Sequence, residues 1–86
     1  MGGYQIEWKR SALKELGRTS DETIARIVHA VEDLSREPFP TGVRKLTSAE
    51  HTYRIRVGDY CVIYTVQENR LIIEIVRVGH RKDVYR

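Results

Sequence analysis

The sequence predicts an α+β fold in which two N-terminal helices pack against a small, mostly antiparallel sheet of about four strands. Three observations point to this class: a short alternating segment comes first, two helical segments follow it, and three β-rich segments separated by turns complete the chain. Helices gathered ahead of such strands are typical of α+β folds, in which they cover one face of the sheet. We therefore predict the element order β-α-α-β-β-β.

Size and composition limit the classes of protein to which the chain can belong. Its 86 residues suffice for one hydrophobic core, so we expect a single domain over residues 1–86. The sequence has no apolar run of about 18 residues and no apolar stretch typical of a signal peptide, so we expect a cytoplasmic protein without a membrane partner. Its one cysteine and three scattered histidines match no zinc-binding spacing, and no Gly-rich phosphate loop occurs. We expect neither a metal nor a cofactor.

The first strand and the first helix are both predicted to be short. Residues 4–8 alternate between apolar and polar side chains, which is typical of a strand. Ser11 is predicted to cap the helix that follows. Gly17 is predicted to end it, because glycine adopts the left-handed conformation of a helix C-terminus without steric cost.

The second helix has the clearest periodicity in the chain. Thr19 and Glu22 fit a capping box at its start. Because proline lacks an amide proton and restricts the residue before it, Pro38 predicts that the helix ends near Ser35 or Arg36. The apolar stripe that we expect to pack on the sheet consists of Ile24, Ile27, Val28, Val31 and Leu34.

A β-hairpin is predicted in the second half of the chain. Residues 53–57 and 60–66 are rich in β-branched and aromatic side chains and flank Gly58-Asp59, a pair that suits a two-residue type II′ turn. This turn places Arg56 opposite Cys61. Paired residues share a face, whereas neighbours along a strand alternate, so Arg54, Arg56 and Cys61 are expected on one face. The other face, directed toward the core, is expected to carry Tyr53, Ile55, Val57, Tyr60, Val62 and Tyr64.

Two further segments flank this hairpin. Residues 41–52 form a polar connector, in which we expect Val43 and Leu46 to touch the core. On the other side, a turn at residues 68–69 leads to the last strand, residues 71–78. This strand is almost continuously apolar, which is typical of a strand that is covered on both faces.

Positive charge is concentrated at the end of the last strand. Residues 77–86 hold four cations against one acidic side chain, Asp83, an excess of three positive charges. If the last strand lies beside the hairpin, His80, Arg81 and Tyr85 approach its two arginines. Such a set suits single-stranded RNA, because guanidinium groups hold phosphates and exposed bases stack on aromatic rings. A solvated basic tail is the alternative interpretation.

Three motifs carry a resemblance to a known family: "RKL" at residues 44–46, "YRIRVGDYCVIY" at 53–64 and "VRVGHRKDVYR" at 76–86. With them, and with its strand-helix-helix order, the chain resembles the RelE/ParE superfamily of bacterial and archaeal toxins, on the RelE mRNA-interferase side. The resemblance implies the toxin of a type II toxin–antitoxin system. Such a toxin cleaves mRNA in the ribosomal A site without a metal, by attack of a ribose 2′-hydroxyl on the adjacent phosphodiester. The implied partners are a RelB-like antitoxin, the ribosome with its mRNA, and operator DNA reached only through the antitoxin.

The resemblance also implies roles for individual residues. Arg54 and Arg56 fall where the family has basic catalytic residues, Arg81 falls on its C-terminal catalytic arginine, and Tyr85 falls on the tyrosine that follows. The resemblance thus implies four catalytic residues, Arg54, Arg56, Arg81 and Tyr85. Because arginine stays protonated, these three arginines suit stabilisation of a charged phosphorane better than proton abstraction. The RNA-binding residues expected around them are Arg44, Lys45, Arg77, His80 and Lys82.

Cys61 departs from the family pattern. RelE-type members commonly have arginine directly after the tyrosine of this hairpin, where it holds the scissile phosphate. Cysteine cannot supply that charge, and losing one such contact costs about 100-fold or more in rate. We expect either a weakened enzyme or simply a small residue on a partly covered strand. His80 is an alternative acid or base because it titrates near neutrality, although neighbours on an extended segment point to opposite faces.

Two other functions are compatible with the sequence. A toxin-fold protein without nuclease activity would inhibit DNA gyrase, as ParE-type relatives do, or serve as an antitoxin-bound transcriptional co-repressor. A general basic RNA-binding domain would bind isolated RNA with a steep salt dependence and without the ribosome. The retained arginines argue against the gyrase inhibitor, whereas Cys61 argues for a weakened enzyme.

Overall fold

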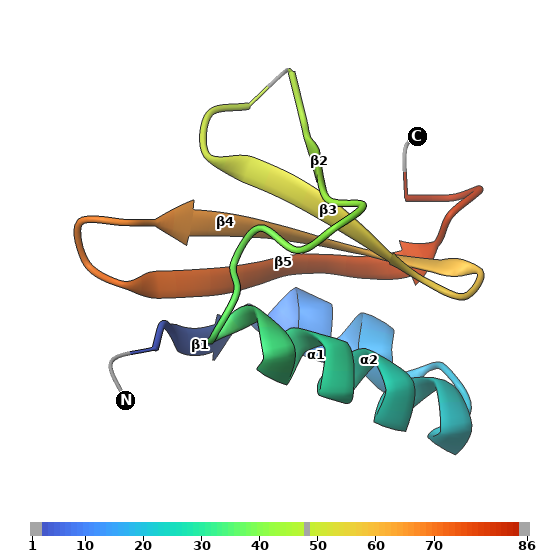
Figure 1. Ribbon diagram of the computed structural model, residues 1–86. Coiled ribbons are helices and arrows are strands. Elements are labelled where there is room, and N and C mark those ends of the chain that lie inside the picture. Colours follow the sequence, from blue (N-terminus) through green and yellow to red (C-terminus); the bar gives the residue numbers. More distant parts are fainter. Residues whose placement is uncertain (1–2, 48, 85–86) are drawn as a thin grey trace.

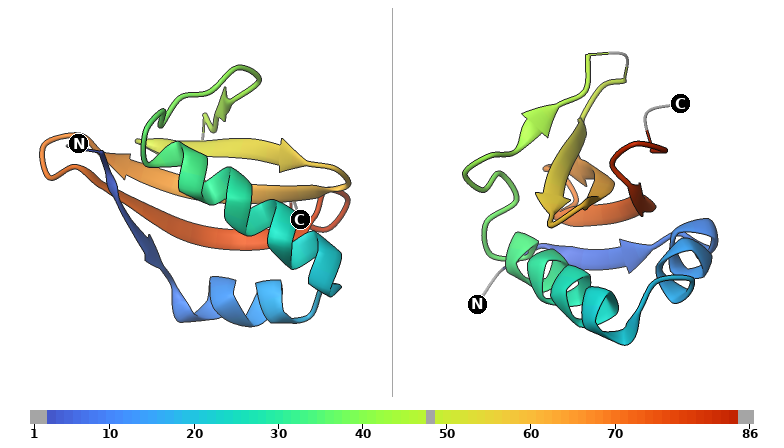
Figure 2. Two further views of the ribbon diagram at one scale, coloured as in Figure 1. Left: turned by 60° about the horizontal axis from the view of Figure 1, so that its bottom comes forward. Right: turned by 90° about the vertical axis from the view of Figure 1, so that its right-hand side faces the viewer.

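The structure is a computed structural model that describes residues 3–47 and 49–84 (Figure 1). One five-stranded sheet has the strand order β1-β5-β4-β3-β2, in which β1 and β5 are parallel and the other neighbours are antiparallel. Both helices lie on the same side of this sheet (Figure 2), which confirms the predicted α+β class. The elements in chain order are β1 (Gln5–Trp8), α1 (Arg10–Gly17), α2 (Asp21–Leu34), β2 (Arg44–Lys45), β3 (Thr52–Val57), β4 (Tyr60–Gln67) and β5 (Ile72–His80).

The strand β2 is the element that the sequence did not reveal. Its two residues lie in the segment predicted to be a polar connector, and both are exposed. Arg44 pairs with Arg54, and Lys45 pairs with Tyr53, at the edge of the sheet. Two exposed residues are too few to produce an alternating pattern that would predict a strand. This strand is defined by its pairing with the edge of β3.

The helix starts differ from those predicted. The helix α1 begins at Arg10 with Lys9 as its N-cap, so the prediction of a cap at Ser11 is wrong. Ser20 caps α2 in place of Thr19, and its hydroxyl oxygen accepts a hydrogen bond from the amide of Thr23 at 3.2 Å. The hydroxyl of Thr19 instead donates to the carbonyl of Leu16 at 2.8 Å, at the end of α1. The choice between two adjacent capping residues therefore follows from the path of the chain between the helices.

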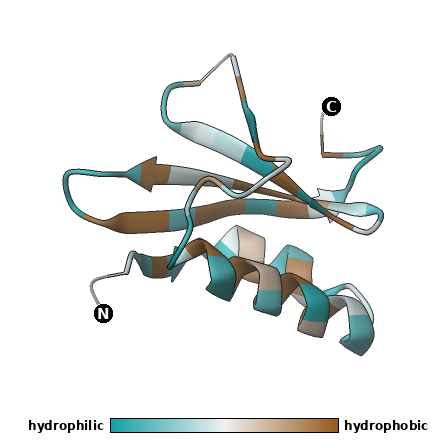
Figure 3. Cartoon of the chain, viewed as in Figure 1, coloured by the Kyte–Doolittle hydropathy of each residue, from teal (hydrophilic) through white to brown (hydrophobic). Residues whose placement is uncertain are grey.

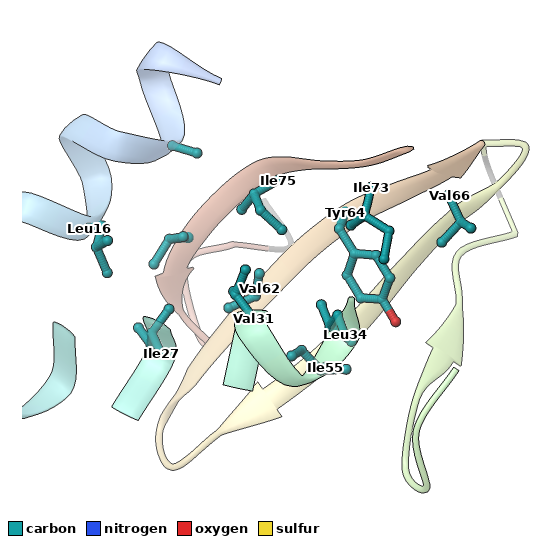
Figure 4. Close-up of a cluster of buried hydrophobic side chains, with 12 residues drawn as sticks. Leu16, Ile27, Val31, Leu34, Ile55, Val62, Tyr64, Val66, Ile73 and Ile75 are labelled. Carbon is teal, nitrogen blue, oxygen red and sulfur yellow. The ribbon is translucent and has the colours of Figure 1, made fainter. Parts of the chain in front are cut away.

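The main core lies between the helices and the sheet (Figure 4). From the predicted stripe of α2, Ile27, Val31 and Leu34 are buried, while Ile24 and Val28 pack beside them as partly buried residues. Hydrophobic stretches run along β4 and β5, and the turn between these strands is hydrophilic (Figure 3). Within residues 3–47 and 49–84, no helix is long and apolar enough to cross a membrane.

The β3–β4 hairpin has the predicted register. Arg54 pairs with Ile63, and Arg56 pairs with Cys61. Gly58, in the first position of the turn, has a φ of 62°, in the left-handed region that favours glycine. The turn between β4 and β5 is longer than predicted, because β5 begins at Ile72 and Leu71 still belongs to the turn.

Tyr64 ties the sheet to the segment after α2. Its side chain is fully buried, and its hydroxyl donates to the carbonyl of Pro38 at 2.7 Å. Its ring stacks near that of Tyr53, with the ring centroids 6.0 Å apart. The loop that leads to β2 is therefore fixed against the central strand β4.

Candidate functional site

The two hairpin arginines lie on the sheet face opposite the helices, which we call the outer face. Ile55 and Val62, which alternate with them along β3 and β4, belong to the core that the helices cover. Arg54 and Arg56 therefore point away from that core, as the alternation of side chains along a strand predicts. Arg56 is exposed, and Arg54 is partly buried.

A second, smaller apolar cluster covers part of the outer face. Its buried members are Cys61, Ile63 and Val84, with Leu46 and Val76 packed against them. Cys61 has no exposed surface, so it is covered more completely than the partly covered strand of the sequence prediction. The position beside Arg56 is thus filled by apolar packing.

Residues 81–84, which we call the C-terminal turn, contribute Val84 to this cover over Cys61. The amide of Arg81 donates to the carbonyl of Asp59 in the hairpin turn at 2.9 Å. The amide of Val84 donates to the carbonyl of His80 at 3.0 Å, which brings the Val84 side chain back over the sheet. The turn lies on the side of the sheet opposite the helices (Figure 2).

The C-terminal turn brings two of the predicted site residues to the outer face. Arg81 and Lys82 are both exposed in it, and the backbone of Arg81 is anchored at the tip of the hairpin that carries Arg56. Tyr85, the fourth predicted catalytic residue, lies outside the described residues. The structure thus brings the turn that carries Arg81 to the same side of the sheet as the two arginines of β3.

A polar pocket adjoins the hairpin arginines at the edge of the sheet. It has a volume of about 400 Å³, and Arg44, Arg54 and Arg56 line it together with Thr41, Gly42 and Ile55. Guanidinium groups bind phosphate and carboxylate oxygens with paired hydrogen bonds, so three of them in one pocket favour an anion. Lys45 pairs with Tyr53, a residue of the opposite face, and is therefore not brought to this pocket by the strand register.

Arg77 and His80 are placed differently from the exposed cations. Arg77 pairs with Ile63, but its guanidinium group contacts a carboxylate oxygen of Glu15 at 3.4 Å and donates to the carbonyl of Val84 at 3.3 Å. His80 pairs with Tyr60 on the helix side of the sheet, with the two ring centroids 5.7 Å apart. These contacts turn both side chains away from the open part of the outer face.

The His80 ring also takes part in the C-terminal turn. Its Nδ1 atom accepts a hydrogen bond from the amide of Lys82 at 3.2 Å. The sequence hypothesis of an acid or base beside Arg81 requires the ring on the outer face, whereas the strand register places it with Tyr60. Glu15 is the residue of this region that sequence reasoning missed, because a single glutamate on a helix gives no signal until its tertiary contacts are known.

Comparisons with known proteins show the family to which the chain is similar. The family model described as "ParE toxin of type II toxin-antitoxin system, parDE" matches residues 6–85. Toxin RelG of Mycobacterium tuberculosis is 31% identical over 84 residues, which cover 96% of this chain and 97% of that toxin.

Solved structures of toxin–antitoxin complexes contain chains with the same fold. The archaeal RelE-RelB complex from Pyrococcus horikoshii OT3 matches with a TM-score of 0.84 and 28% identity, covering 98% of this chain and 100% of that one. The RelBE2 complex from Mycobacterium tuberculosis matches with a TM-score of 0.80 and 28% identity, covering 92% and 99%. The chain therefore belongs to the RelE/ParE toxin family of type II toxin–antitoxin systems, with RelG and RelE toxins among its relatives.

Proposed function

We propose that this toxin is a metal-free endoribonuclease that cleaves mRNA in the ribosomal A site. The observation that carries the proposal is the arrangement of the outer face: Arg54 and Arg56 pair with Ile63 and Cys61, which cluster with Val84 of the turn that carries Arg81. Similarity to RelE and RelG toxins supports the same assignment. The pocket lined by three arginines supports binding of an RNA phosphate at this face.

The proposed reaction is an intramolecular transesterification. The ribose 2′-oxygen attacks the adjacent phosphorus and loses its proton, while the bond from phosphorus to the 5′-oxygen breaks and that oxygen gains a proton. The products are a 2′,3′-cyclic phosphate and a 5′-hydroxyl. Negative charge builds up on the phosphorane oxygens, and donors fixed in advance stabilise it more strongly than water can. We assign this task to Arg54, Arg56 and Arg81, because arginine stays protonated at neutral pH.

Other residues of the outer face are assigned to RNA binding. Arg44 lines the same pocket as the two hairpin arginines, and Lys82 is exposed beside Arg81. Tyr85, which lies outside the described residues, is assigned to stacking on an RNA base. In the cell, a RelB-like antitoxin is the proposed partner that holds the toxin inactive, as RelE-RelB complexes of related chains suggest.

The direct test of this proposal is a ribosome programmed with a defined mRNA. Purified toxin is added with and without its antitoxin, and the 5′ ends of the mRNA fragments are mapped. We expect cuts within the A-site codon that require the ribosome and stop when antitoxin is present. Uncut mRNA on the ribosome, at a toxin concentration that arrests growth in cells, would overturn the nuclease assignment.

A second function, inhibition of DNA gyrase, is favoured by two observations. The family model that matches residues 6–85 is that of the ParE toxin, and a buried Cys61 stands where RelE-type members commonly have arginine. Gyrase supercoiling in the presence of the purified toxin separates the two functions. Inhibition of supercoiling without RNA cleavage identifies a gyrase inhibitor. If the toxin neither cleaves RNA nor inhibits gyrase, and repression of its operon is lost when the toxin is absent, the toxin is an antitoxin-bound co-repressor.

A further inference from the structure

Among the residues that the structure describes, no strand lies beside the last part of β5 on the side of β1. The parallel pairing of β1 with β5 runs from Gln5 to Trp8 and reaches Ile75 on β5, whose carbonyl accepts from the amide of Lys9 at 3.0 Å. Beyond that point a side chain, instead of a neighbouring strand, accepts a hydrogen bond from the edge of β5. The Oε1 atom of Glu15, on α1, accepts from the amide of Val78 at 2.9 Å. Glu15 thus supplies an acceptor where β1 has ended.

The second carboxylate oxygen of Glu15 holds an arginine. Its Oε2 atom lies 3.4 Å from Nη2 of Arg77, and the two side chains are 27% and 42% exposed. The Nη1 atom of the same guanidinium group donates to the carbonyl of Val84 at 3.3 Å. One planar arginine therefore connects α1, on the helix side of the sheet, with the C-terminal turn on the outer face. Because this ion pair is partly buried, solvent and salt screen it less than they would screen an exposed pair.

Val84 is the residue that fixes the C-terminal turn to the sheet. Its side chain is 4% exposed and packs on Cys61 and Ile63. A Cβ atom at Gly79 would lie 3.6 Å from the Val84 side chain, which shows how closely the turn approaches β5. The hydrogen bond from Arg77 to the carbonyl of Val84 fixes one end of the turn. The bond from the Arg81 amide to the carbonyl of Asp59 fixes the other end.

We propose that Glu15 and Arg77 are positioning residues that hold the C-terminal turn over the outer face and thereby place Arg81 for the reaction. This inference rests on the proposed nuclease function for the role of Arg81. It assigns Arg77 to the support of the turn, whereas the sequence suggested RNA binding. A well-oriented group contributes to rate by being in place before the reaction, so loosening the turn lowers the rate even though neither residue contacts RNA.

The sharpest variant is Glu15→Gln. The glutamine oxygen still accepts from the amide of Val78, but its NH2 group then faces the guanidinium of Arg77, donor against donor. Arg77→Met removes the same link from the other side and keeps an aliphatic side chain of similar length. Glu32→Gln, an exposed position on α2, makes the same charge change elsewhere and serves as the control.

Hydrogen exchange measured by NMR tests the positioning directly. In Glu15→Gln we expect exchange of the Arg81 and Val84 amides to become about tenfold faster, while the Val78 amide stays within about threefold of the original toxin. Arg77→Met is expected to accelerate exchange of the same two amides. The double variant is expected to show no further change, because both substitutions break the same contact between Glu15 and Arg77. Glu32→Gln should leave all three amides unchanged. Unchanged exchange at Arg81 in both Glu15→Gln and Arg77→Met overturns the inference.

Kinetics on programmed ribosomes connects the turn with the reaction. We expect kcat of Glu15→Gln and Arg77→Met to fall about tenfold with KM within about twofold, since the turn places a group that acts on the transition state. Faster exchange at Arg81 without any change in kcat overturns the link to catalysis. If the original toxin cuts no mRNA, the nuclease proposal fails, and the exchange data still decide whether Glu15 and Arg77 hold the turn. If Glu15→Gln does not fold, Arg77→Met alone decides the question.

Discussion

The side chain of Val84 covers Cys61 on the outer face of the sheet and leaves the cysteine without exposed surface. The resemblance to RelE-type toxins places an arginine at this position, directly opposite Arg56 in the hairpin. In this chain the space is filled by an apolar contact that also fixes the C-terminal turn. The turn carries Arg81, so the absence of one arginine is linked structurally to the placement of another.

Cys61→Arg is expected to destabilise the toxin. A charged group at this buried site either stays desolvated, which costs solvation free energy, or pushes Val84 away, which removes packing, so both outcomes lower stability. We expect the free energy of unfolding to fall by about 2 to 4 kcal/mol, measured by urea denaturation. Cys61→Val is the control, because a side chain of similar size should cost about 1 kcal/mol or less. Equal stability of Cys61→Arg and the original toxin would contradict this packing.

Arg56→Ala tests the role of the exposed hairpin arginine. We expect kcat for cleavage on programmed ribosomes to fall about 100-fold, because one contact to the charged transition state is lost. The melting temperature should hardly change, since the Arg56 side chain is exposed. Arg70→Ala removes one positive charge from the exposed turn between β4 and β5 and should leave kcat unchanged. If both substitutions lower kcat equally, the effect is one of net charge and the assignment of Arg56 is wrong.

Tyr64→Phe tests the buried link to Pro38. Loss of the 2.7 Å hydrogen bond leaves the carbonyl without this donor, and we expect a cost of about 1 kcal/mol in the free energy of unfolding at pH 7. Burial, with a smaller effect of the nearby Tyr53, raises the pKa of Tyr64 above its ordinary value. The phenol therefore stays neutral in the folded chain when the unfolded chain begins to ionise.

The sign of the pH effect follows from that raised pKa. Below about pH 9 the stability contributed by neutral Tyr64 is fully present. As the pH rises through about 10 and onward toward the folded-state pKa, the unfolded chain loses the proton first, and this contribution declines. The stability difference between the original toxin and Tyr64→Phe should thus narrow above about pH 10, measured by urea unfolding at several pH values. A difference that stays constant over that range would contradict the raised pKa.

Ser20→Ala tests which residue caps α2. Its hydroxyl oxygen accepts from the Thr23 amide, so we expect a loss of about 1 kcal/mol in the free energy of unfolding. Ser11→Ala is the matched control, because Ser11 lies inside α1 and alanine has the higher helix propensity. Thermal unfolding should show a lower melting temperature for Ser20→Ala only. A larger loss for Ser11→Ala would contradict the assignment of Lys9 as the N-cap of α1 and would restore Ser11 in that role.

The parts of the fold that could be predicted are those with local signals. The apolar stripe of α2 appears as a helical period, and Gly58-Asp59 fixes the hairpin register because a two-residue turn leaves one pairing. That register predicts Arg54, Arg56 and Cys61 on one face, and the structure confirms the pairing. The strand β2, the cap at Ser20 and the cover over Cys61 had no such signal.

Two features of this toxin are predictable from its sequence alone: two helices on a mostly antiparallel sheet, and arginines of β3 that share a face with Cys61. Those features follow from periodicity and turn chemistry within short segments. The packing of Val84 with Cys61 and the contact of Glu15 on α1 with Arg77 depend on the tertiary structure. Such contacts join residues distant in the sequence, and they form only when the packing of α1 and the end of β5 brings the side chains within reach.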